Sequence, residues 1–78
     1  MITMTKRFTI TATSNLADLE FNTNDYDEAE VMYTQCANST HYTQVVWTNG
    51  YTGEIYRHRD LKFEHGGVYR TEYQALPF

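Results

Sequence analysis

The residues of this 78-residue chain whose type and spacing suggest a chemical role are its aspartates and glutamates. Between Phe8 and Tyr56 there is no Lys or Arg, while the acidic residues there are Asp18, Glu20, Asp25, Asp27, Glu28, Glu30 and Glu54. Like charges that cluster repel one another, so such a segment favours a basic counterpart on another molecule. Paired carboxylates can also serve acid–base catalysis, but no pattern around these residues predicts a pocket.

Part of this acidity has a purely structural explanation. Carboxylates in the first turns of a helix complement the helix dipole, which stabilises a helix by about 0.3–1 kcal/mol per residue. That explanation leaves out the acids that precede the helix. We therefore predict a partner-binding surface of carboxylates, one small apolar contact and two aromatic anchors, comprising Asp18, Glu20, Asp25, Asp27, Glu28, Glu30, Val31, Trp47 and Tyr56.

Histidine and cysteine supply the other reactive side chains. Cys36 is the only cysteine, and it accompanies His41, His58 and His65. Their spacings fit no zinc pattern, which needs ligand pairs two to four residues apart. We expect no metal site and no cofactor, with Cys36 as a small buried residue rather than a nucleophile.

Two short segments resemble known motifs. Residues 58–61 resemble the catalytic loop of protein kinases, although His65 stands where that motif has Asn. Residues 41–47 resemble a signature of the cysteine-rich secretory (CAP) superfamily, which implies a role for His41 alone, although Thr40 replaces the usual Gly. We interpret both as coincidences, the second on a good strand sequence, and predict that the protein is not an enzyme.

Length and composition bound the remaining possibilities. The chain is expected to form one domain, residues 1–78, with large aromatic side chains to fill its core. A single cysteine and the lack of a long apolar run predict a cytoplasmic protein without a membrane segment. The net charge of −4 disfavours direct nucleic-acid binding. A lesser alternative is that basic and tyrosine residues on the last strands form a platform that binds single-stranded nucleic acid. Acidic residues interrupt the positive charge of that platform.

The elements that must position these residues follow from periodicity. Alternating apolar residues predict strands over residues 7–14 and 17–22. Residues 41–48 are rich in β-branched and aromatic side chains, with Val45, Val46 and Trp47 in succession, which predicts a central strand, and further strands are predicted over 54–59 and 68–73. Leu61 and Phe63 continue the fourth strand, after a bulge. Residues 26–37 have a helical period, with Asp25 at the N-cap and Asn38 at the C-cap.

The predicted fold is α+β: an antiparallel sheet of four to five strands in the order ββαββ, with room for a further strand, and one amphipathic helix on one face. Phe8, Ile10 and Ala12 would face the helix. Thr9, Thr11, Tyr56 and some late tyrosines would lie on the second face. Val31 would lie opposite the apolar face of the helix.

In type, this short, acidic, tyrosine-rich chain resembles small phage-encoded proteins that disable host factors, such as anti-CRISPR proteins. The resemblance implies a non-enzymatic inhibitor that presents carboxylates to a basic, nucleic-acid-binding surface of a protein partner, in the cytoplasm of the host cell. The alternative is a homodimeric structural module that pairs through its open sheet face.

Overall fold

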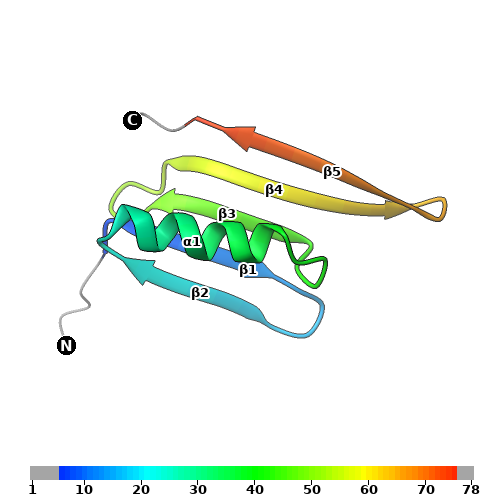
Figure 1. Ribbon diagram of the computed structural model, residues 1–78, viewed down its shortest axis with the longest axis horizontal. Coiled ribbons are helices and arrows are strands. Elements are labelled where there is room, and N and C mark those ends of the chain that lie inside the picture. The colour runs from blue at the N-terminus through cyan, green and yellow to red at the C-terminus, as the bar shows by residue number, and fades with distance from the viewer. Residues whose placement is uncertain (1–5, 76–78) are drawn as a thin grey trace.

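The computed structural model describes residues 6–75. Its elements are β1 (Phe8–Thr13), β2 (Asp18–Thr23), α1 (Tyr26–Ala37), β3 (Gln44–Asn49), β4 (Ile55–Glu64) and β5 (Gly67–Gln74). In this part of the chain the strands form one antiparallel sheet of five, in the order β2-β1-β3-β4-β5, and α1 packs on one face (Figure 1). The predicted α+β fold is confirmed, including the further strand.

The core lies between α1 and the middle of the sheet. Side chains alternate along β1, so that every second one is buried beneath the helix. The helix contributes Ala29 and Tyr33, which lie one turn apart on the same side. The buried apolar residues are Phe8, Ile10, Ala12, Ala29, Tyr33, Cys36, Ala37, Val45, Trp47 and Tyr56.

The helix begins where the capping residues place it. The Asp25 carboxylate accepts a hydrogen bond of 2.9 Å from the backbone N–H of Asp27, and the Thr23 hydroxyl accepts one of 3.0 Å from the N–H of Asp25. These bonds satisfy backbone donors near the start of the helix, where the first turn leaves N–H groups without partners. The predicted helix bounds, 26–37, are those observed.

The end of the helix depends on a residue from β4. The last turn of α1 has no basic residue of its own. Instead, the guanidinium of the fully buried Arg59 donates to the carbonyls of Cys36 and Ala37, at 2.9 and 3.0 Å. It also donates to the carbonyls of Ser39 and Tyr42, at 3.0 and 2.7 Å. One side chain thus holds both the helix C-terminus and the segment that leads into β3.

A bulge places Tyr56 on the face opposite to the expected one. Trp47 is opposite Arg57, but Thr48 is opposite Ile55, so Tyr56 is the extra residue of β4. Such a bulge breaks the alternation of faces. Tyr56 consequently packs under the helix, with its ring centroid 6.2 Å from that of Phe8. The expectation that Tyr56 lies on the second face was wrong, and β4 runs on without interruption to Glu64.

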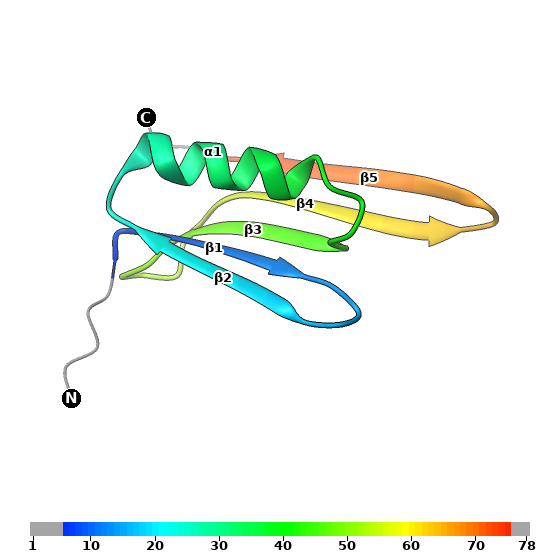
Figure 2. The same cartoon turned by 60° about the horizontal axis from the view of Figure 1, so that its bottom comes forward.

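The open face of the sheet is polar, and one hairpin extends beyond the helix. Thr9 and Thr11 lie on this face as expected, since their neighbours in β1 are the buried ones. Tyr73 stacks on His58 there, with ring centroids 5.1 Å apart. The helix lies over β1, β2 and β3, whereas the β4–β5 hairpin reaches past its end (Figure 2).

Candidate functional site

The acidic residues lie on two different surfaces. Asp18 and Glu20 are opposite Thr13 and Thr11 across the β1–β2 ladder. Directly opposite residues point to the same face of a sheet, and those threonines face away from the helix. The carboxylates of β2 therefore lie on the open face, while those of α1 lie on the other side of the molecule.

The acids of the helix are all exposed but point in different directions. Successive residues turn by about 100° around a helix axis. Glu28 and Glu30 therefore lie on opposite flanks of α1, with Asp27 and Val31 between them on the outer side. Val31 is 57% exposed, as its predicted position opposite the core requires.

None of these carboxylates is neutralised by an ion pair among residues 6–75. The ion pairs there join His58 to Asp60, Lys62 to Glu64 and Arg70 to Glu72, all on β4 and β5. The carboxylates between residues 18 and 30 accept only hydrogen bonds from uncharged groups. They therefore keep their negative charge available to another molecule.

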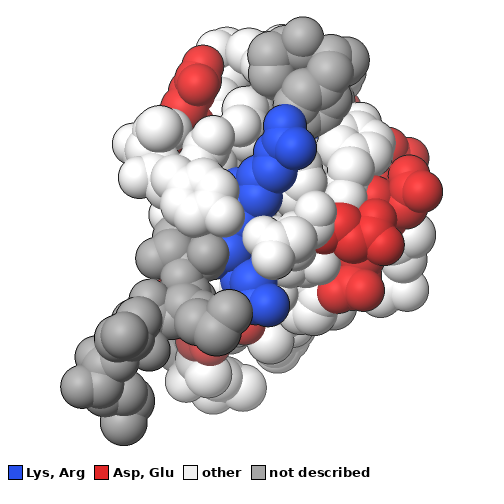
Figure 3. Space-filling view, turned by 90° about the vertical axis from the view of Figure 1, so that its left-hand side faces the viewer, with Lys and Arg blue, Asp and Glu red and all other residues white. Residues whose placement is uncertain are grey.

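A stripe of basic side chains lies beside the acidic helix start (Figure 3). Arg57 covers the ring of Tyr33, with its guanidinium carbon 4.5 Å from the ring centroid. Burial raises the pKa of Tyr26, and its hydrogen bond to Glu30 raises that pKa further, whereas nearby Arg57 lowers it. Glu30 is thus partly engaged within the molecule, as is Asp25 through the helix cap, which leaves Asp27 and Glu28 as the less constrained carboxylates.

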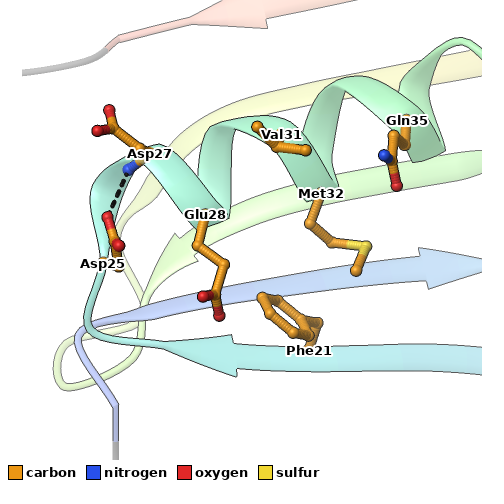
Figure 4. Close-up of a pocket in the computed structure, with 7 residues that line it drawn as sticks. All are labelled: Phe21, Asp25, Asp27, Glu28, Val31, Met32 and Gln35. Atoms are coloured by element: carbon orange, nitrogen blue, oxygen red, sulfur yellow. Dashed lines mark hydrogen bonds between the residues drawn. The ribbon is translucent and has the colours of Figure 1, made fainter.

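A groove of about 360 Å³ lies between α1 and β2, where the sequence indicated no pocket. Phe21 from β2 and Met32 from α1 form its apolar part, and Glu28 extends from the helix toward Phe21 (Figure 4). Its lining residues are Phe21, Asp25, Asp27, Glu28, Val31, Met32 and Gln35. The groove thus combines an apolar wall with carboxylates grouped at the helix start. No local sequence pattern reports such a gap between two elements.

The two predicted aromatic anchors lie in the core. Trp47 is fully buried and is opposite Ile10 on the helix face of the sheet. Tyr56 is 4% exposed and lies against Trp47, with ring centroids 6.3 Å apart. Neither side chain offers a partner any appreciable surface in this structure, so both stabilise the fold instead. The run of three consecutive apolar residues, Val45, Val46 and Trp47, is typical of a central, covered strand and was the sequence signal for a buried Trp47.

Cys36 is expected to be unreactive in the folded protein. Its side chain is buried on the apolar side of α1. Burial raises the pKa of its thiol, although the nearby charge of Arg59 lowers that pKa. Because the thiolate is the reactive form, the native thiol should react with a disulfide reagent at least about a hundred times more slowly than in urea. The absorbance of the thiolate that the reagent releases measures both rates. Equal rates in the two conditions would contradict a buried thiol.

Within residues 6–75, no three side chains of His, Cys, Asp or Glu gather closely enough to hold a metal ion. The single helix of this region is too short and too polar to cross a membrane. Comparison with protein-family models, with curated proteins and with solved structures finds no match to this chain.

Proposed function

We propose that this protein is a small non-enzymatic inhibitor or modulator that binds a basic surface of a partner protein. The observation that carries the proposal is the groove between α1 and β2, which joins an apolar wall to exposed carboxylates without ion pairs among the described residues. The binding residues are Asp25, Asp27 and Glu28, with Val31 as an apolar contact and Glu30 at the margin.

The groove fits the shape of a Lys or Arg side chain. Such side chains lay an aliphatic stem along apolar surface and keep the charged head among polar groups. The stem lies against Phe21 and Met32, and the cationic head reaches the carboxylate of Glu28, while the Asp27 carboxylate adds negative charge from the outer side of the helix. Hydrogen bonds between ionised partners are stronger than those between neutral ones. The remaining carboxylates steer the encounter over a longer range.

Basic surfaces of this kind are common on proteins that hold nucleic acid, where carboxylates can occupy the positions of phosphates. Inhibition in the manner of phage-encoded anti-CRISPR proteins, in the cytoplasm of a host cell, fits this chemistry. Asp18 and Glu20 belong to the opposite face and contribute steering rather than contact. The placement of the basic residues favours this proposal over direct nucleic-acid binding, because Arg59 is buried and Lys62 and Arg70 have acidic partners.

Charge reversal in the groove is expected to weaken binding to a basic probe. The variant Asp27→Lys/Glu28→Lys should bind a labelled oligo-arginine peptide about tenfold more weakly or worse, since each change replaces attraction by repulsion. Fluorescence anisotropy at several salt concentrations measures the effect. The salt dependence should also decrease, because fewer charges meet.

The opposite face provides a matched control. Asp18→Lys/Glu20→Lys makes the same change in net charge but leaves the groove intact. Its affinity for the peptide should fall less than threefold. Equal losses in both double variants would mean that the peptide responds only to net charge, and the proposed surface would have to be abandoned. The same pair of variants then tests any basic protein captured from host cells.

A further inference from the structure

β5 forms one edge of the sheet, and half of its backbone groups point outward. The N–H of Ala75 donates to the carbonyl of Tyr56 at 2.7 Å, in register with the β4–β5 ladder. In an antiparallel pair, every second residue exchanges hydrogen bonds with its partner strand. Residues 69, 71 and 73 therefore bond toward β4. The outward groups, which no strand of the described residues meets, belong to Val68, Arg70, Glu72 and Gln74.

The residues of β5 on the two sides of Thr71 complement each other. Reading outward from Thr71, the two directions give Arg70 and Glu72, then Tyr69 and Tyr73. A second copy turned by 180° about an axis through Thr71 therefore puts Arg70 of one copy opposite Glu72 of the other, twice. It also puts Tyr69 opposite Tyr73, twice. All four outward residues of each strand meet outward residues of the other, so each free N–H faces a free carbonyl.

We propose that two copies of this chain pair through their β5 edges, antiparallel and with Thr71 opposite Thr71, to form a two-fold symmetric dimer with one continuous sheet. This inference goes beyond the proposed function and does not depend on it. The dimer also differs from pairing through the open sheet face, because the contact is made by backbone hydrogen bonds along the edge. An interface of this kind is isologous and closes after two copies.

The side chains of β5 supply the energy that bare backbone pairing lacks. Tyr69 and Tyr73 lie on the open face and are 56% and 47% exposed. Aromatic pairs directly across two strands stabilise a sheet, as do pairs of opposite charge. On the helix face, Arg70 already contacts Glu72 of its own strand at 2.5 Å. In the dimer the Arg70–Glu72 pair of one copy lies beside that of the other copy. Each of these four charges then has opposite charges as its nearest neighbours.

The other edge of the sheet is unsuited to the same pairing. The Ser14 N–H donates to the carbonyl of Ala17, so the outward residues of β2 are Asp18, Glu20 and Asn22. A two-fold arrangement that uses all three puts Glu20 opposite Glu20. Like charges directly opposite destabilise a pair of strands, and charged residues are a common means of protecting an edge. The contrast makes β5 the edge that pairs.

Charge reversal tests the proposed register. Analytical ultracentrifugation of the full chain, over a concentration series that reaches the millimolar range, should show a monomer–dimer equilibrium. Arg70→Glu and Glu72→Arg should each weaken dimerisation at least about tenfold, because both cross-strand pairs become repulsive. A mixture of these two variants should recover a heterodimer, since every opposing pair is then of opposite charge. A wild-type chain that stays monomeric throughout the series would overturn the proposal.

Two further measurements separate the edge from other contacts. The swapped variant Arg70→Glu/Glu72→Arg keeps self-complementary charges and should dimerise like the wild type, which excludes loss of folding as the cause. Hydrogen exchange should slow with concentration at the outward amides of Arg70 and Glu72, and stay unchanged at that of Thr71. A dimer that ignores both single reversals, or that protects residues of the open face instead, would overturn edge pairing. Neither result bears on peptide binding by the groove.

Discussion

Replacement of Arg59 by Met is expected to lower the free energy of unfolding by about 3–5 kcal/mol, the largest loss that any charged residue of this chain should produce. Four carbonyl groups, those of residues 36, 37, 39 and 42, lose their donor together in that variant. A domain of this size is stable by roughly 4–12 kcal/mol in total. The variant should therefore be near the limit of folding at room temperature.

A conservative change separates the charge from the geometry. Arg59→Lys retains a cation, but an ammonium group carries three donors on one atom and cannot reach four separated carbonyls. Its stability should fall between those of the wild type and Arg59→Met. Burial lowers the pKa of Arg59, and the charge of Arg70 lowers it further. The guanidinium nevertheless keeps its proton at neutral pH, because an arginine starts from so high a value.

Urea denaturation followed by far-ultraviolet circular dichroism measures these losses. Lys62→Met is the matched control, because it removes an exposed cation of the same strand whose partner is Glu64. Surface ion pairs contribute about 0–1 kcal/mol, so this control should stay close to the wild type. An Arg59→Met variant as stable as Lys62→Met would show that the helix end does not need the guanidinium.

Replacement of Trp47 by Ala should lower the free energy of unfolding by about 3–5 kcal/mol. Trp47 is fully buried, and its ring contacts those of Phe8, Tyr33 and Tyr56, with centroids 5.7 to 6.3 Å away. Truncation leaves a large cavity at the centre of this aromatic cluster. The loss reflects packing alone, because the indole N–H has no hydrogen-bond partner among the described residues.

That missing partner makes a second variant informative. Trp47→Phe removes an unsatisfied N–H together with part of the ring, so the two effects partly offset each other. Its cost should be about 1–2 kcal/mol, well below that of Trp47→Ala. Tyr51→Ala, at a residue 64% exposed, is the control and should change stability by no more than about 0.5 kcal/mol. Thermal unfolding by circular dichroism is suitable, since both Trp47 variants lack the only tryptophan. Equal losses for Ala and Phe would contradict this account.

Much of the fold could be predicted because its signals are local. The helix has a clear apolar period and a capping Asp25, and the observed bounds agree with the prediction. The strands β1 and β2 alternate over their whole length, so the first hairpin followed directly. The bulge at Tyr56 escaped prediction because it arises from the match between β3 and β4, which no window of either strand contains.

The candidate site was less predictable for the same reason. Sequence reasoning grouped Asp18 and Glu20 with the helix acids, since they are close in the chain. The strand pairing shows that they point to the opposite face. Arg59 is among the most buried residues, although nothing in its local sequence distinguishes it from the other basic residues of the last strands. Its burial depends on carbonyl groups about twenty residues earlier, and charge patterns along a sequence do not report such contacts.

The position of Arg59 also affects the order in which the elements can fold during synthesis. A growing chain emerges from the ribosome with its N-terminal elements first. When α1 has left the ribosome, the residue that completes its last turn still lies 22 residues behind Ala37 and is not yet available. The last turn of the helix therefore stays open to water until β4 is synthesised and inserts beside β3. Completion of the helix and closure of the sheet become one event during biosynthesis, and a nascent chain that stops before β4 lacks both.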